Sequence, residues 1–333
     1  MSEGKHMNAK SAIIHRSKIY LAALTLLACA TAGILRAGAP QAANNAAVKP
    51  PAQQRGFATA KQAADALVQA AKNYDLPALK EIFGPDGEDF VSTADPVQDK
   101  NHSERFAAKA GEKLEVVTDT KNPARATLVV GNEEWPTPVP IVRIAGKWYF
   151  DSKAGHDEIL RRRIGADELD AIQICRGYVE AQLEYSSEAH DDSGVHQYAQ
   201  RIVSTPGKHD GLAWREADGT WAGPVGEGVA KAIEQGYSER GEPFHGYFFK
   251  ILKGQGPAAP LGELDFVIGG VMIGGFALAA APAEYRITGV QTFIVSHDGI
   301  VYEKDLGPDS LTVFKRMDRY NPDKTWHRTT DNW

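Results

Sequence analysis

The densest group of potential metal ligands lies in the middle of the chain, where His190, Asp191, Asp192 and His196 follow one another closely. Imidazole and carboxylate groups both coordinate divalent ions. The spacing matches no zinc motif, however, and a loop would have to bring all four side chains together. The pattern therefore favours a solvated polar loop, with a divalent-metal site as the alternative.

A second candidate site lies in the aromatic segment around His245. If this segment is a strand, alternation places His245, Tyr247 and Phe249 on one face. Together with a carboxylate such as Glu284, His245 and Tyr247 could form a polar pocket for acid–base chemistry. A structural hydrogen bond from His245 to the backbone is the simpler interpretation, and the sequence leaves both open.

Nucleophilic and cofactor chemistry has little support in the sequence. Cys175 lies on the apolar side of a predicted helix, which favours a small buried hydrophobe over a reactive thiolate. The nucleophile elbow of hydrolases, the phosphate-binding loop, the Cys-x-x-Cys pair and the His-Glu-x-x-His zinc motif are all absent from the sequence. We therefore expect no cofactor, and we favour a protein without enzymatic activity while leaving that question undecided.

The first 36 residues have the layout of an export signal. Basic residues precede an apolar run from Ile19 to Ile34, and alanine-rich sequence follows. We expect a periplasmic or secreted protein that meets the membrane only through this segment. Lipidation at Cys29 is an alternative to cleavage. A retained anchor is a third, although the run is slightly short of the roughly 20 residues that span a bilayer.

The charge of the chain argues against one class of partner. The net charge is −6 at pH 7, and the leader is basic, so the exported remainder is more acidic than the whole. Nonspecific binding to nucleic acid needs a basic surface. We therefore expect no nucleic acid, and as partner an envelope protein or a small ligand.

The sequence predicts an α+β protein with two domains after the leader and a flexible linker at residues 37–55. In residues 56–155, a helix opens with Thr59 and Gln62 in a capping-box pattern, and helices precede four strand-like runs. Helices followed by an antiparallel meander form an α+β layout. This order resembles the cone-shaped folds of nuclear transport factor 2 and cystatin.

The second predicted domain covers residues 156–333. Leu169, Ile172, Val179 and Leu183 recur at helical spacing in a long helix from about His156 to Glu188, with a possible break at Gly165. Strand-like runs follow, and Asp298-Gly299 provides the clearest hairpin turn. A long helix packed on an antiparallel sheet resembles the globular heads of type IV pilins.

Several segments together resemble one exported bacterial family, known as domain of unknown function 2950. They include residues 146–151 (GKWYFD), 210–214 (DGLAW), 243–252 (PFHGYFFKIL) and 298–307 (DGIVYEKDLG). The resemblance extends from about Phe57 to Leu311. It implies no activity, cofactor or catalytic residue.

These observations predict an exported envelope protein with a structural or binding role and no recognised catalytic machinery. Two alternatives remain open. One is a periplasmic hydrolase with a pocket around His245, Tyr247 and Glu284. The other is a small-molecule carrier that uses a cavity of the first domain, behind Trp148 and Phe150.

Overall fold

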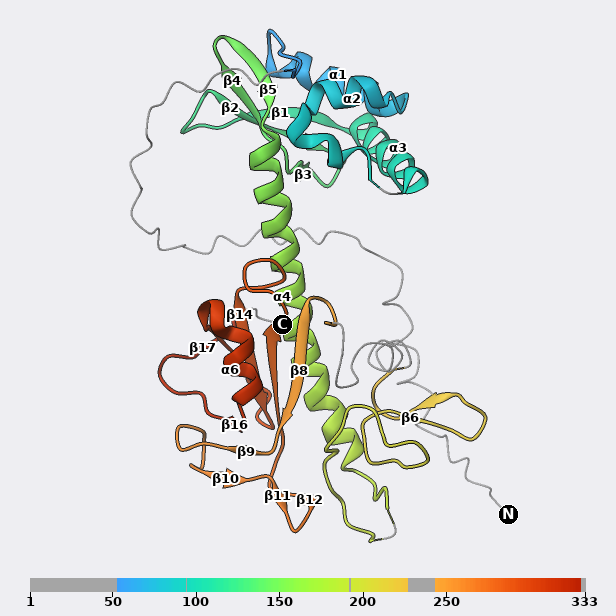
Figure 1. Ribbon diagram of the computed structural model, residues 1–333, viewed down its shortest axis with the longest axis vertical. Coiled ribbons are helices and arrows are strands. Elements are labelled where there is room, and N and C mark those ends of the chain that lie inside the picture. The colour runs from blue at the N-terminus through green and yellow to red at the C-terminus, as the bar shows by residue number, and fades with distance from the viewer. Residues whose placement is uncertain (1–52, 94, 192, 227–242, 331–333) are drawn as a thin grey trace, which may run out of the picture. The chain divides into compact units, whose positions relative to one another are not determined.

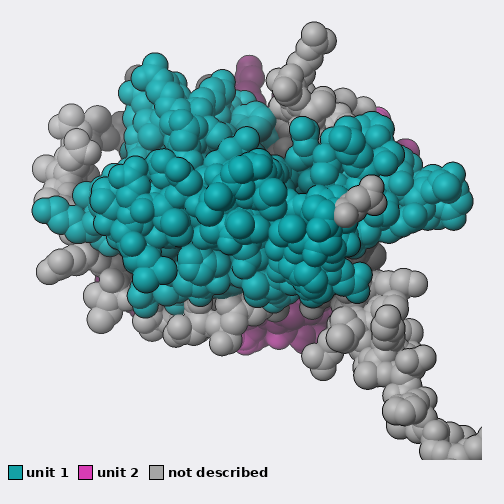
Figure 2. Space-filling view, turned by 90° about the horizontal axis from the view of Figure 1, so that it is seen from below, with its two compact units in different colours: residues 1–19, 162–333 teal, residues 20–161 magenta. Residues whose placement is uncertain are grey.

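The computed structural model describes residues 53–93, 95–191, 193–226 and 243–330. They form two compact units, which are coloured separately in Figure 2, and the division falls between Arg161 and Arg162. Within the described residues, no helix has the length and apolar character needed to cross a membrane. The predicted leader and Cys29 lie outside the described residues. Helices combined with mainly antiparallel sheets confirm the α+β class.

The N-terminal unit combines helices with an antiparallel sheet (Figure 1). The sheet order is β1-β2-β4-β5, with β3 on β2. As predicted, the Thr59 hydroxyl caps the first helix by accepting from the Gln62 backbone N–H at 3.1 Å. The elements are α1 (Ala60–Lys72), α2 (Leu76–Phe83), the 3₁₀ helix η2 (Pro85–Phe90), α3 (Pro96–Glu112), β1 (Leu114–Thr118), β2 (Arg125–Val130), β3 (Trp135–Pro136), β4 (Ile141–Ile144) and β5 (Lys147–Phe150).

Helix α4 (Ser152–Tyr185) is continuous, so the predicted break at Gly165 is wrong. A glycine inside a helix costs only about 1 kcal/mol, which is too little to end a helix of this length. The expected apolar stripe is also partly wrong, because Leu169 and Leu183 are each more than half exposed. Ile172, Cys175 and Val179 of the predicted stripe are buried as expected, and Ala171 and Tyr178 are buried beside them.

The C-terminal unit is built around a five-stranded antiparallel sheet in the order β17-β15-β14-β13-β8 (Figure 1). Strand β13, which lies between β14 and β8, is buried along its whole length, and α4 packs against it through the Tyr178 ring, whose hydroxyl lies 3.4 Å from the Ala277 carbonyl. The elements are β8 (Tyr247–Leu252), β13 (Ala277–Pro282), β14 (Gln291–Ser296), β15 (Tyr302–Asp305), the 3₁₀ helix η3 (Gly307–Asp309), α6 (Ser310–Arg316) and β17 (His327–Arg328).

The C-terminal unit also contains three short ribbons that are separate from this sheet. Two are hairpins, and in the third β16 runs parallel to β9. They are β6 (Trp214–Arg215) with β7 (Trp221–Ala222), β11 (Val267–Ile268) with β12 (Val271–Met272), and β9 (Gly254–Gln255) with β10 (Leu264–Asp265) and β16 (Arg319–Tyr320).

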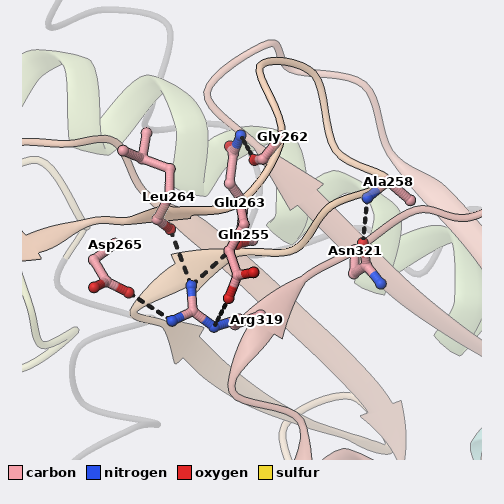
Figure 3. Close-up of polar contacts among 8 residues, drawn as sticks. All are labelled: Gln255, Ala258, Gly262, Glu263, Leu264, Asp265, Arg319 and Asn321. Carbon is pink, nitrogen blue, oxygen red and sulfur yellow. Dashed lines mark hydrogen bonds and ion pairs between the residues drawn. The ribbon is translucent and has the colours of Figure 1, made fainter.

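Arg319 joins the three strands of the last ribbon (Figure 3). Its guanidinium donates to the carbonyls of Gln255 at 3.1 Å and Leu264 at 3.2 Å, and to the Asp265 carboxylate at 2.6 Å. A Cβ on Gly254 would lie 2.9 Å from the backbone carbonyl oxygen of Leu264 and 2.7 Å from the guanidinium, so the close approach of β9 and β10 favours glycine here. The Asp265 carboxylate therefore has a structural role, as the partner of Arg319.

Candidate functional site

His245 lies in a tight turn and not within a strand. Phe244 and Tyr247 exchange backbone hydrogen bonds of 2.9 and 3.0 Å, and the φ angles of His245 and Gly246 are +47° and +73°. Two central residues with positive φ are typical of a two-residue hairpin turn. The predicted alternation, with His245 and Tyr247 on one strand face, is wrong because β8 begins only at Tyr247.

The His245 side chain pairs with helix α4. Its Nδ1 lies 2.6 Å from Asp170 Oδ2, and both side chains are nearly half exposed. One turn earlier on the helix, the Asp167 carboxylate lies against Gly246, where a Cβ would be 2.7 Å from Oδ2. Burial raises the pKa of Asp167, an effect that Arg163 opposes. Two carboxylates of α4 thus lie against the turn before β8, and Asp170 is bonded to it through His245.

Glu168 fixes a second loop to the same helix. Its Oε1 accepts hydrogen bonds from the backbone N–H groups of Val290 at 2.8 Å and Gln291 at 3.0 Å. Arg163 adds a hydrogen bond to the Ile287 carbonyl at 3.3 Å. The acidic segment of α4 therefore positions two loops at the ends of β8 and β14.

The other two residues predicted beside His245 lie elsewhere. Tyr247 is fully buried, donates to the Gln291 carbonyl at 2.9 Å, and has its pKa raised by burial. Glu284 is exposed at a turn in which its carbonyl accepts from the Ile287 N–H at 3.0 Å. In the part of the chain that the structure describes, no hydrogen bond or ion pair joins Glu284 to His245, whose carboxylate partner is Asp170.

We expect replacement of His245 with glutamine to change the free energy of unfolding by less than about 1 kcal/mol, because ion pairs between exposed groups contribute little. Urea unfolding followed by tryptophan fluorescence measures the change. His327→Gln, at another exposed histidine, is the matched control. A loss above about 2 kcal/mol for the His245 variant alone would show that this pair is more than a surface contact.

The described side chains among the predicted metal ligands are hydrogen-bonded to other groups of the same chain. His190 Nε2 lies 2.7 Å from the Tyr185 carbonyl, and His196 Nδ1 lies 3.0 Å from the Ser186 carbonyl. Asp191 accepts from the Ser193 N–H at 3.0 Å. Asp192 lies outside the described residues. Among the residues described, no three His, Cys, Asp or Glu side chains are grouped so that they could hold a metal ion.

A hollow of about 590 Å³ lies at the C-terminal end of α4, and we call it the helix-end hollow. Its walls come from the last turn of α4 and from two segments of the irregular chain that follows. The lining residues are Tyr185, His190, Asp191, Gln197, Tyr198, Gln200, Arg201, Gly207, Lys208, His209 and Asp210.

Aromatic rings support two imidazoles of the helix-end hollow. His190 stacks on Tyr185 with ring centroids 3.9 Å apart, and His209 stacks on Trp214 at 4.5 Å. The Tyr185 hydroxyl donates to the His209 carbonyl at 2.6 Å. Burial, assisted by Asp210 and Asp191, raises the pKa of Tyr185 to about 12, so the phenol stays protonated.

The charged groups of the hollow are partly paired with one another. Arg201 Nε lies 3.7 Å from Asp210 Oδ2. The Asp210 carboxylate also accepts from the Thr205 N–H at 2.7 Å and the Thr205 hydroxyl at 2.8 Å. Burial works in the opposite direction, but these hydrogen bonds and Arg201 lower the pKa of Asp210. Asp210 is therefore a carboxylate at neutral pH.

A buried glutamine fixes one wall of the hollow. Gln182 is fully buried on α4; its Nε2 donates to the Ala199 carbonyl and its Oε1 accepts from the Ala199 N–H, both at 2.8 Å. Beside it, the Tyr198 N–H donates to the Met272 carbonyl at 2.8 Å, and the Gln200 amide donates to the Gly270 carbonyl at 2.7 Å. Hydrogen bonds thus attach this wall both to α4 and to the β11–β12 hairpin.

The two residues behind which a carrier cavity was predicted in the first domain, Trp148 and Phe150, both contact other protein side chains. Phe150 is 2% exposed and packs on Phe83 with ring centroids 5.3 Å apart. The Arg143 guanidinium covers the ring of Trp148, 5.9 Å from its centroid. Both aromatic side chains are thus occupied by protein neighbours.

Comparison with known proteins identifies one family. The model of the family described as protein of unknown function (DUF2950) matches residues 54–329. No curated protein and no solved structure matches the chain. The likenesses to nuclear transport factor 2, cystatin and pilin heads therefore stay predictions.

Proposed function

The chain belongs to the DUF2950 family, and we propose that it is an exported envelope protein that binds a small ligand in the helix-end hollow. The observation that carries this proposal is the hollow itself. Its volume of about 590 Å³ lies within the roughly 300–1,000 Å³ of small-molecule sites. Its polar groups come from three segments held by hydrogen bonds, of which those between Gln182 and Ala199 are buried.

Binding is favoured over catalysis by the surroundings of the reactive groups. The Cys175 thiol is fully buried, and this burial raises its pKa to about 12, which disfavours a thiolate. In the hollow, the Tyr185 hydroxyl donates to a backbone carbonyl and not to a base. Nucleophilic catalysis needs a nucleophile within reach of a base.

Export rests on the basic and apolar leader in the sequence. Its test is fractionation of cells that produce the full chain, with mass spectrometry of the mature N-terminus. We expect the body outside the cytoplasm. An intact N-terminus on soluble cytosolic protein would contradict export.

The binding role has its own experiment. The chain is purified under native conditions and denatured, and the released small molecules are identified by mass spectrometry. Lys208→Trp is the control, because Lys208 is exposed and an indole at this position would fill the hollow. A compound released by the original chain but not by the variant supports the proposal. Equal release from both, or none from either, contradicts it.

A further inference from the structure

We infer that the ligand of the helix-end hollow is a small organic oxyanion, carrying a carboxylate or a phosphate group. This inference rests on the binding role proposed above and adds the chemical class of the ligand. It follows from which hydrogen-bonding groups of the lining are already engaged and which are not.

The carboxylates of the hollow are already supplied with donors. Asp191 accepts from the backbone N–H of Ser193 and from the Gln197 amide, at 3.0 and 2.8 Å. Asp210 accepts from the N–H and the hydroxyl of Thr205. Such carboxylates offer few lone pairs to a ligand, so a cation has little to coordinate.

The cationic side chains of the hollow retain donors. Arg201 Nε lies 3.7 Å from Asp210 Oδ2, beyond hydrogen-bond distance, so the guanidinium keeps N–H groups for a ligand. Neither Lys208 Nζ nor the His209 ring has a hydrogen bond to another of the described residues. A guanidinium and an ammonium that line the same hollow match an oxyanion through charge-assisted hydrogen bonds.

A neutral polyhydroxyl ligand matches a lining with available donors and engaged acceptors less well. Each of its hydroxyl groups donates as well as accepts, so its site needs free acceptors. The amides of Gln197 and Gln200 offer their carbonyl oxygens, but the carboxylates are engaged. The groups of the hollow that remain available to a ligand are thus mainly hydrogen-bond donors.

The size of the hollow and its imidazoles indicate an organic body attached to the anion. Two rings, His190 and His209, line the hollow, and each stacks on an aromatic ring, Tyr185 or Trp214. Supported flat rings offer rigid contact area to a ring-shaped molecule. A free inorganic anion would leave much of the 590 Å³ to water.

Matched pairs of probes test the inference by isothermal titration calorimetry on the full chain. Galacturonate is compared with galactose, and glucose 6-phosphate with glucose, so that each pair differs by one oxyanion. We expect at least one acidic member to bind at least tenfold more tightly than its neutral partner. The two pairs distinguish a carboxylate from a phosphate. Equal affinity within both pairs, or no binding of either acid, would overturn the inference.

Variants of Arg201 and Lys208 test whether these two cations bind the oxyanion. We expect Arg201→Gln and Lys208→Gln each to weaken binding of the acidic probe at least tenfold, with an unchanged melting temperature. Lys324→Gln removes an exposed lysine outside the hollow and should leave binding unchanged. Unaltered affinity in both hollow variants would place the anion elsewhere and overturn the inference. The extraction experiment judges the binding role separately, because a neutral compound released from the hollow would support that role while refuting the anion.

Discussion

Replacing Phe293 with alanine is expected to lower the free energy of unfolding of the C-terminal unit by about 3–5 kcal/mol. Phe293 is fully buried on β14, with its ring 5.8 Å from that of Tyr247. Truncation removes the buried ring and leaves a cavity that the central sheet cannot close. Urea unfolding followed by near-ultraviolet circular dichroism measures the loss.

The control for this variant is Val313→Ala on α6. Val313 is 40% exposed, so we expect its truncation to cost less than about 1 kcal/mol. Similar losses for the two variants would mean that the sheet is not the main source of stability in this unit.

Replacing Gln182 with leucine is expected to cost about 2–4 kcal/mol and to abolish ligand binding in the hollow. Leucine keeps much of the side-chain volume but leaves the N–H and the carbonyl of Ala199 without their 2.8 Å partners. The segment that carries Gln197, Gln200 and Arg201 then loses its attachment to α4. Chemical unfolding and calorimetry of the acidic probe follow the two effects.

Gln173→Leu is the matched control, because Gln173 lies on the same helix and is exposed. We expect it to change stability by no more than about 0.5 kcal/mol. If Gln182→Leu binds its probe as the unaltered chain does, the Gln182 amide does not hold the wall of the hollow.

Local patterns predicted much of the fold. Asp298-Gly299 gives the hairpin of β14 and β15, where Gly299 has the positive φ (+73°) that such turns require. Thr59 caps α1 as expected. These features depend on neighbouring residues, which a single sequence displays directly. The break predicted at Gly165 was wrong because the helix preference of one residue, about 1 kcal/mol, is small beside that of the remaining helix.

The candidate site was harder to predict. Phe244-His245-Gly246-Tyr247 looks like strand sequence, yet its glycine permits a turn, and the partner of His245 is Asp170, far away in the chain. The helix-end hollow was missed because its walls are irregular and its closure depends on Gln182 meeting Ala199. A signal was present in the crowding of histidine and aromatic residues between Tyr185 and Trp214, which suggested metal ligands and not a ligand pocket.

The thiol of Cys175 can report transient opening of the core around α4. Its side chain has no exposed surface, and its high pKa makes the thiol slow to react even when a reagent arrives. Alkylation by iodoacetamide must therefore wait until the core around α4 opens, so the modification rate follows transient exposure of that core. Peptide mass mapping separates this signal from any label on Cys29, and the same measurement inside intact cells would compare the stability of the C-terminal unit in the cell with that of the purified chain.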